Sequence, residues 1–220
     1  MASAAQAKAF IDTVAPIAVK VCKERGYGNA QAWTCVAQAC CESAFGTSKI
    51  MANANAFFGI KANKSWIQKA KYGGKVYNAK TKECYDGKTY VSINDCFRAY
   101  NNMEDSIRDY FDLIEGNRYK ASLTKGTVLE CITDIKNGGY ATSPTYINTI
   151  TSIFGKYESQ IRKYTVDGKA PAPAAKKSNV EIAEEVCQGK WGNGQERKDR
   201  LRAAGYDPTA IQKLVNVMMS

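Results

Sequence analysis

Glu42 is the residue whose surroundings point most directly to chemistry. It ends a 16-residue stretch, from Gly26 to Cys41, that contains no charged side chain. The apolar spacing of this stretch predicts a buried helix, which Ser43 then breaks. The helix dipole and poor hydration both disfavour an anion at the C-terminal end of such a helix, so the pKa of Glu42 should be raised. A general acid working near neutral pH needs this property, although a core helix that simply reaches solvent would show the same pattern.

Glu83 is the natural partner for Glu42 if the reaction is glycoside hydrolysis, which usually uses two carboxylates. Segment 72–91 carries aromatic and β-branched residues around Asp86-Gly87, which predicts a β-hairpin. We therefore expect Glu83 to face Glu42 across a cleft. The alternative is an exposed carboxylate paired with a neighbouring lysine. The other acidic cluster is predicted to be a solvated helix face, formed by Glu104, Asp105, Asp109 and Asp112.

A glycine-rich loop at residues 138–144 brings two tyrosines, Tyr140 and Tyr146, into the candidate chemistry. Such a loop can bring backbone and aromatic rings close to a ligand. It can equally be a tight turn between helices, with Ser143 as the N-cap and Pro144 as the first helical residue. Both interpretations can hold together.

Several classes of protein are excluded by composition. The chain has no histidine, which removes Ser-His-Asp and Cys-His catalysis. None of the eight cysteines forms a C-x-x-C pair, so we expect no metal and no cofactor, and reduced cysteines in the core. The net charge of +10 implies an acidic partner, either nucleic acid or an anionic polymer such as bacterial cell wall. The scattered lysines argue against nucleic acid.

The apolar periodicity predicts an α+β organisation, mainly helical with one small β-lobe. The predicted helices span residues 4–25, 31–42, 92–114, 127–137 and 144–163. We expect a first domain over residues 1–164 and a Pro/Ala-rich linker over 165–178. Residues 179–220 predict a module of three short helices, around 180–187, 195–204 and 208–218. A core this small is marginal, so recognition is a better function for the module than a second enzyme.

Five blocks of the first domain, in order, resemble the glucosaminidases of glycoside hydrolase family seventy-three, which are flagellar and autolysin-type peptidoglycan hydrolases. These blocks are A-Q-A-C-C-E-S-A-F-G-T-S at 37–48, F-F-G-I-K at 57–61, T-K-E at 81–83, F-R-A-Y at 97–100 and G-Y-A-T-S-P at 139–144. Two positions depart from the family pattern, because Phe45 replaces a tryptophan and Ala56 replaces an asparagine. Subsite contacts can therefore differ from those of the family.

The resemblance implies a lysozyme-like fold and cleavage of β-1,4 bonds after N-acetylglucosamine. It implies that Glu42 is the general acid, that Glu83 is the base or an electrostatic helper, and that Tyr140 positions the substrate. We also expect substrate contacts from Ser43, Asn55, Phe58 and Tyr146. The alternatives are a lytic transglycosylase or muramidase of the same fold, a bacterial autolysin, or a wall-binding protein without activity.

The C-terminal module resembles the three-helix wall-binding repeat of certain phage lysins, through W-G-N-G-Q-E-R at 191–197 and A-G-Y-D at 204–207. The resemblance implies binding to the muropeptide part of the wall, with Trp191, Arg197, Tyr206 and Asp207 as contacts. The whole chain then looks like a phage endolysin. Residues 1–8 lack a secretory signal, so we expect the protein in the host cytoplasm until a holin-type release. We expect no membrane span, and a monomer.

Overall fold

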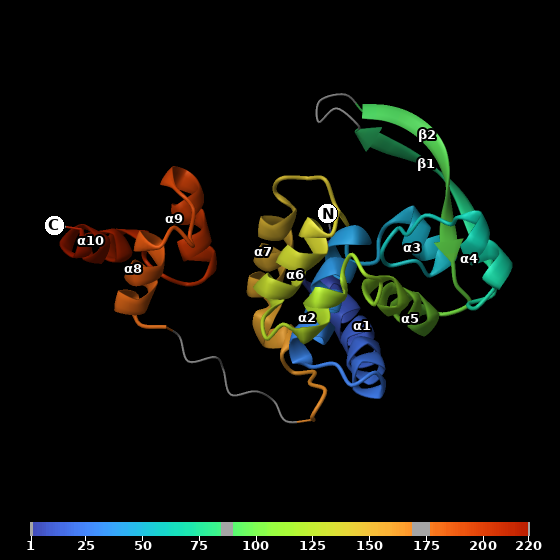
Figure 1. Cartoon of the computed structure of the whole chain (residues 1–220), viewed down its shortest axis with the longest axis horizontal. Helices are drawn as coiled ribbons and strands as arrows, with labels where there is room; N and C mark the ends of the chain where they lie inside the picture. The colour runs from blue at the N-terminus through green and yellow to red at the C-terminus, as the bar shows by residue number, and fades with distance from the viewer. Residues whose placement is uncertain (1, 85–89, 169–176, 220) are drawn as a thin grey trace. The chain divides into compact units, whose positions relative to one another are not determined.

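The computed structural model describes residues 2–84, 90–168 and 177–219, and their side chains except those of residues 81–93 and 203. The chain divides into two compact units, Met1–Ala170 and Pro171–Ser220 (Figure 1). Each unit has its own core of buried apolar side chains. None of the described helices is long and apolar enough to cross a membrane. The described residues include no group of three or more cysteine, aspartate or glutamate side chains placed to hold a metal ion.

The helix that ends at Glu42 lies at the centre of the first unit. This helix, α2 (Asn29–Glu42), is buried at every position from Ala30 to Cys40, as the uncharged sequence predicted. Small residues on all its faces let other helices approach closely on several sides. The helices around it are α1 (Ala4–Glu24), α6 (Val128–Asn137) and α7 (Tyr146–Ile161). Because α2 is held on several sides, the position of Glu42 is fixed by the core.

A long hairpin forms the β-lobe. Strands β1 (Lys75–Cys84) and β2 (Tyr90–Ala99) pair antiparallel, from Lys75 opposite Ala99 to Cys84 opposite Tyr90. The hairpin curves away from the helical body, with α3 (Lys49–Ala54) and α4 (Lys64–Lys69) at its base (Figure 1). The predicted turn at Asp86-Gly87 lies outside the described residues.

The predicted helix over residues 92–99 is wrong, because this segment is a strand with partners on both edges. Besides β1, the segment before α4 bonds to it: Ala62 donates its N–H to the Cys96 carbonyl at 2.8 Å, and Arg98 donates to the Ile60 carbonyl at 2.9 Å. These bonds satisfy the backbone of the segment without a helix. The following helix, α5, runs from Met103 to Ile114.

Asp109 of α5 is buried and anchors the lobe, which corrects its prediction as part of a solvated face. Its side chain is 4% exposed and accepts hydrogen bonds from Arg98 at 2.8 and 3.0 Å. Tyr100 donates its hydroxyl to the same carboxylate at 2.6 Å, and the Trp66 indole donates at 3.1 Å. One carboxylate thus ties β2, the residue after it and α4 to α5. Burial of this charge is tolerated because each of its oxygens is hydrogen-bonded.

The first unit is completed by a short 3₁₀ helix (Lys120–Thr124) and by the segment after α7. Trp33 donates its indole N–H to the Tyr164 carbonyl at 2.8 Å, and the Val166 amide donates to Asn29 at 2.7 Å. Thr165 is buried. The folded chain therefore continues a few residues past position 164, because these bonds hold it against α2.

The second unit is a bundle of three short helices. These are α8 (Asn179–Cys187), α9 (Gly194–Ala203) and α10 (Pro208–Met218). Its core consists of Ile182, Ala183, Val186, Leu201, Ile211 and Val215. The capping box of Ser178 and Glu181 begins α8, and Asp207 accepts the Thr209 amide at the start of α10. The three-helix architecture predicted from the sequence is confirmed.

Candidate active site

A tight turn ends α2 directly after Glu42. Ala44 and Phe45 have φ values of 49° and 55°, a left-handed region that costs about 1 kcal/mol or more per non-glycine residue. Gly46 continues the turn at φ 80°, where a Cβ would come within 2.6 Å of the Phe10 ring. Ser43 is fully buried and donates its hydroxyl to the Ala39 carbonyl at 2.6 Å, while the Gly46 amide donates to it at 2.8 Å. The Ser43 hydroxyl therefore bonds to the backbone of the turn and has no exposed surface for a substrate.

The Glu42 carboxyl is half-buried and accepts one hydrogen bond from the described residues. Tyr146, the first residue of α7, donates its hydroxyl to Oε1 at 2.6 Å. No lysine or arginine of the described residues forms an ion pair with Glu42. Burial raises the pKa of Glu42 above its ordinary value, and the hydrogen bond from Tyr146 offsets part of that rise. The carboxyl is therefore held in a fixed orientation while its protonated form is favoured.

Tyr140 adds a second hydroxyl to this site. Its ring stacks on Tyr146 with centroids 6.1 Å apart and meets Tyr119 edge-on at 6.2 Å. Its hydroxyl oxygen is buried and has no hydrogen-bond partner among the described residues. Burial and the nearby Glu42 raise the pKa of Tyr140, so its proton is retained. A buried donor without a partner is costly, and a ligand that accepts from it would recover that cost.

The loop before α7 differs from its prediction. The helix begins at Tyr146, with Thr145 as N-cap and no side-chain cap. Ser143 instead shares a hydrogen bond with the Thr145 hydroxyl at 3.1 Å, within a turn. The prediction of Ser143 as N-cap and Pro144 as first helical residue is therefore wrong, because the chain makes this extra turn first.

Three other predicted site residues lie in different environments. Asn55 ends α3 at φ 49°, is half-buried and donates its amide to the Tyr100 carbonyl at 3.2 Å. Phe58 is only 5% exposed and stacks on Tyr110 at 4.3 Å, so it is a core residue here. Glu83 lies on β1 opposite Val91, near the described end of the hairpin, but its side chain lies outside the described residues. The distance from Glu83 to Glu42 thus stays a prediction.

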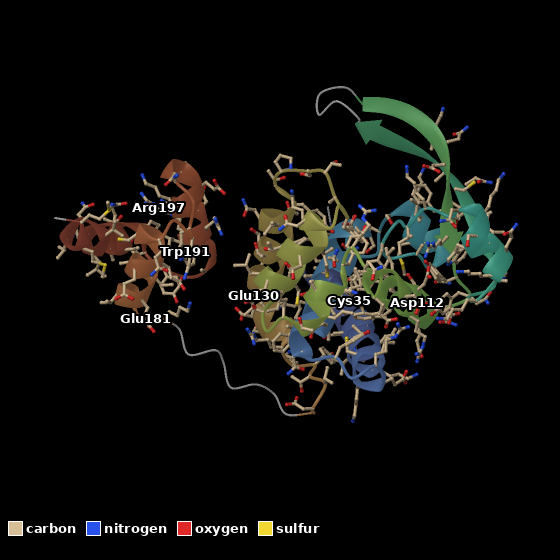
Figure 2. All side chains as sticks on the ribbon, in the orientation of Figure 1. Cys35, Asp112, Glu130, Glu181, Trp191 and Arg197 are labelled. Atoms are coloured by element: carbon tan, nitrogen blue, oxygen red, sulfur yellow. The ribbon has the colours of Figure 1, made fainter. Side chains whose placement is uncertain are left out.

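The four predicted wall-binding residues all belong to the second unit, where Figure 2 labels Trp191 and Arg197. Trp191 donates its indole N–H to Glu185 at 3.0 Å and meets the Tyr206 ring edge-on at 6.2 Å. Arg197 donates to the Gln212 amide oxygen at 2.9 Å. Asp207 caps α10. Each of them helps to hold the bundle together, and their part in wall binding stays a prediction.

Two polar residues near Glu42 were not predicted from the sequence. Gln38, one turn earlier on α2, is fully buried, and so is the hydroxyl-bearing ring of Tyr110 on α5. Gln38 bonds to both Tyr110 and Tyr146. A glutamine one turn before Glu42, on a helix without charged residues between them, was the available signal.

Comparison with known families identifies both units of the chain. The glucosaminidase family model, described as mannosyl-glycoprotein endo-beta-N-acetylglucosaminidase, matches residues 15–159. The chain belongs to this glucosaminidase family. The matched range includes Glu42, Tyr140 and Tyr146, as well as the whole hairpin. A second family model, the CW_7 repeat, matches residues 180–219. The predicted resemblance and the predicted α+β fold are both confirmed.

Individual relatives agree with these family matches. The glucosaminidase domain is similar to the peptidoglycan hydrolase FlgJ of Vibrio parahaemolyticus, with 34% identity over 158 residues, which are 69% of this chain and 48% of that protein. The second unit is 62% identical over 40 residues to the lysozyme of Streptococcus phage Cp-7, covering 18% of this chain and 12% of the phage protein. The chain thus spans about half of the first relative's length and much less of the second's.

A solved structure shares the fold. A peptidoglycan hydrolase mutant from Sphingomonas sp. A1 matches with a TM-score of 0.59 and 28% identity, over 70% of this chain and 97% of that chain. The match covers nearly all of that domain. The arrangement of helices and hairpin in the first unit is therefore shared with that hydrolase structure.

Proposed function

We propose that this chain is a peptidoglycan hydrolase that cleaves the β-1,4 bond after N-acetylglucosamine. The observation that carries the proposal is the glucosaminidase match over residues 15–159, which encloses a half-buried carboxyl, Glu42, in a site that favours its protonated form. The name of the Vibrio relative, a peptidoglycan hydrolase, agrees with this substrate.

Glu42 is proposed as the general acid. Its proton passes to the glycosidic oxygen, so that the next sugar leaves as an alcohol while positive charge develops on the N-acetylglucosamine ring in an oxocarbenium-like transition state. The hydrogen bond from Tyr146 holds the carboxyl in one orientation, and stabilises the carboxylate that remains after proton transfer. Tyr140, whose buried hydroxyl lies near this carboxyl, is proposed to position the substrate.

Activation of water is the second half of the reaction. Glu83 on β1 is proposed as the base, since a strand of the hairpin can bring a carboxylate to the opposite side of the sugar. If Glu83 stays remote from Glu42, the acetamido group of the substrate can assist instead. A Glu83→Gln variant separates the two routes, because only the first requires this carboxylate.

The second unit is proposed to tether the enzyme to its polymer. Its similarity to part of a phage lysozyme supports a role in bacteriophage lysis, with access to the wall after release from the host cytoplasm. Tethering raises the local concentration of the catalytic unit without adding catalytic contacts.

The deciding experiment is mass spectrometry of borohydride-reduced products from digested peptidoglycan. Reduced N-acetylglucosamine ends are expected. Reduced muramic acid ends would identify a muramidase, and anhydro ends a lytic transglycosylase, and either would overturn the proposed bond. Absence of new ends would leave a wall-binding protein.

Glu42→Gln tests the acid directly. The variant should lose about 100-fold or more of the rate, because general acid catalysis contributes on that order. Glu130→Gln is the matched control, since Glu130 is an exposed carboxylate at the start of α6. An active Glu42→Gln enzyme would contradict the assignment.

A further inference from the structure

Three buried side chains form a continuous series of hydrogen bonds that ends on the half-buried Glu42. Tyr110 of α5 donates its hydroxyl to Gln38 Oε1 at 2.5 Å. Gln38 Nε2 donates to the Tyr146 hydroxyl at 2.9 Å, and Tyr146 donates to Glu42 Oε1 at 2.6 Å. This series of hydrogen bonds therefore runs from α5 through α2 to α7 and back to the end of α2.

The direction of each bond in this series follows from the number of protons available. A tyrosine hydroxyl has one proton, and an amide has donors on only one of its two ends. Because Tyr110 donates to the amide oxygen of Gln38, the amide nitrogen must face Tyr146. Tyr146 then accepts from that nitrogen, and its own proton is left for Glu42. Reversal of the amide would present its oxygen to Tyr146 and draw the proton away from Glu42.

Among the described residues, no charged group other than Glu42 itself competes with these hydrogen bonds from the elements packed around them. The titratable groups that face them are neutral thiols and hydroxyls from α1, α2, α6 and the loop before α7, namely Cys22, Cys35, Cys40, Cys41, Cys131 and Tyr140. Burial raises the pKa of each of them. The direction of these hydrogen bonds is thus set by Tyr110, Gln38 and Tyr146 themselves.

We propose that Tyr110 and Gln38 are positioning residues, which orient the Tyr146 hydroxyl as a donor to Glu42 from the far side of the core. This inference rests on the proposed function, since it assigns a role to Glu42 as the acid. Neither residue touches the carboxyl, so their effect is transmitted only through Tyr146. Both lie in the hydrophobic core, where an amide and a hydroxyl need such partners.

The consequence is a change in pH dependence. A donor to Glu42 favours its ionised form, so losing that donor raises the pKa of Glu42. The acid must be protonated to act, hence activity falls as pH rises through this pKa. Removing the Tyr110 hydroxyl frees the Gln38 amide to reverse, so the alkaline limb of the rate profile should move to higher pH. Tyr146→Phe should move it in the same direction and further.

The experiment measures kcat/KM against pH for Tyr110→Phe, Tyr146→Phe and the double variant of the full chain. Tyr110→Phe should lose about three- to tenfold at the optimum, equivalent to one hydrogen bond, and shift the alkaline limb upward. In the Tyr146→Phe background the same substitution should no longer shift the limb. ¹³C-carboxyl NMR of labelled glutamates should report the same displacement of the Glu42 titration without relying on activity.

Tyr72→Phe is the matched control, because Tyr72 is also buried and donates its hydroxyl to a carboxylate, Asp112, at 2.8 Å, and none of its described hydrogen bonds leads to Glu42. It should leave the pH profile unchanged. Gln38→Met provides an independent test, because it removes both the amide N–H that donates to Tyr146 and the amide oxygen that could draw the Tyr146 proton away from Glu42. In the Gln38→Met background, Tyr110→Phe should therefore no longer shift the limb. An unshifted limb in Tyr110→Phe alone, or an equal shift in the backgrounds that lack the Tyr146 hydroxyl or the Gln38 amide, would overturn the inference. Failure of the proposed function would give a different result, because the wild-type protein would then release no new reducing ends from peptidoglycan.

Discussion

At the scale of single residues, several features that lower the stability of the folded state lie close to Glu42, and the rest of the fold must offset them. Glu42 is a carboxyl without a cationic partner among the described residues, at the negative end of a buried helix. Tyr140 holds a buried hydroxyl without a partner among them. Ala44 and Phe45 adopt left-handed backbone immediately after the acid. Strain and unmet hydrogen bonds of this kind gather at functional sites because catalysis requires them.

Glu42→Gln should therefore stabilise the folded protein in a pH-dependent way. The folded-state pKa of Glu42 lies above its ordinary value, so the folded state is favoured while the carboxyl is protonated and loses this stability as pH rises through that pKa. Glutamine has the same shape and does not ionise. The melting temperature of the variant should exceed that of wild type near neutral pH, and the difference should shrink toward about pH 3.5. A constant difference across this range, measured by calorimetry, would contradict the raised pKa.

At the scale of elements, α2 and the hairpin carry the two predicted carboxylates, and α5 connects them. Gln38 on α2 bonds to Tyr110, while the buried Asp109 beside it on α5 holds Arg98 of β2 and Trp66 of α4. Two neighbouring residues of α5 thus reach different parts of the molecule. Tyr110 is linked to Glu42, and Asp109 is linked to the place where the β-hairpin joins the helical body. Movement of α5 would disturb both halves of the site.

Asp109→Asn should loosen the lobe more than the body. Removing one partner of a buried ion pair typically costs about 3 kcal/mol or more, and here it leaves Arg98 unpaired. Urea unfolding should show a loss of this size, and hydrogen exchange should quicken in β1 and β2 before it does in α2. Asp105→Asn is the control, since that carboxylate is exposed on the same helix. Equal effects from the two substitutions would mean that Asp109 is not the anchor.

The sequence predicted most elements because their signals are local. The helix over the uncharged run before Glu42 and the three short helices of the module needed no tertiary information. The strand at residues 92–99 was missed because its identity depends on Ile60 and Ala62 pairing with its second edge. Asp109 was read as solvated for the same reason, since Arg98 and Trp66 reach it only in the folded lobe. Gln38 and Tyr110 were not predicted as site residues for the same reason, because the hydrogen bonds that link them to Tyr146 form only in the folded protein.

At the scale of the whole molecule, charge and recognition are divided between the two units. Residues 179–220 contain six basic and six acidic side chains, so the net charge of +10 lies entirely in the residues before them. Under the proposed function, attraction of the first unit to an anionic wall should be electrostatic and screened by salt, with a Debye length of about 8 Å at physiological ionic strength. The neutral module has no such net attraction, so its binding should depend on specific contacts.

A truncated protein that ends at Ala170 should keep its glycan-cleaving activity and lose the attachment that the second unit is proposed to provide. The first unit has its own core, so cleavage of soluble glycan fragments should match that of the full chain. On intact cell walls its rate should fall by about 100-fold, the range by which a linked module raises avidity. Its remaining attachment to walls should weaken steeply between low and physiological salt, whereas the full chain should stay bound. Turbidity and wall-pelleting assays over a salt series measure both effects, and equal salt sensitivity of the two proteins would show that the module does not provide the charge-independent attachment.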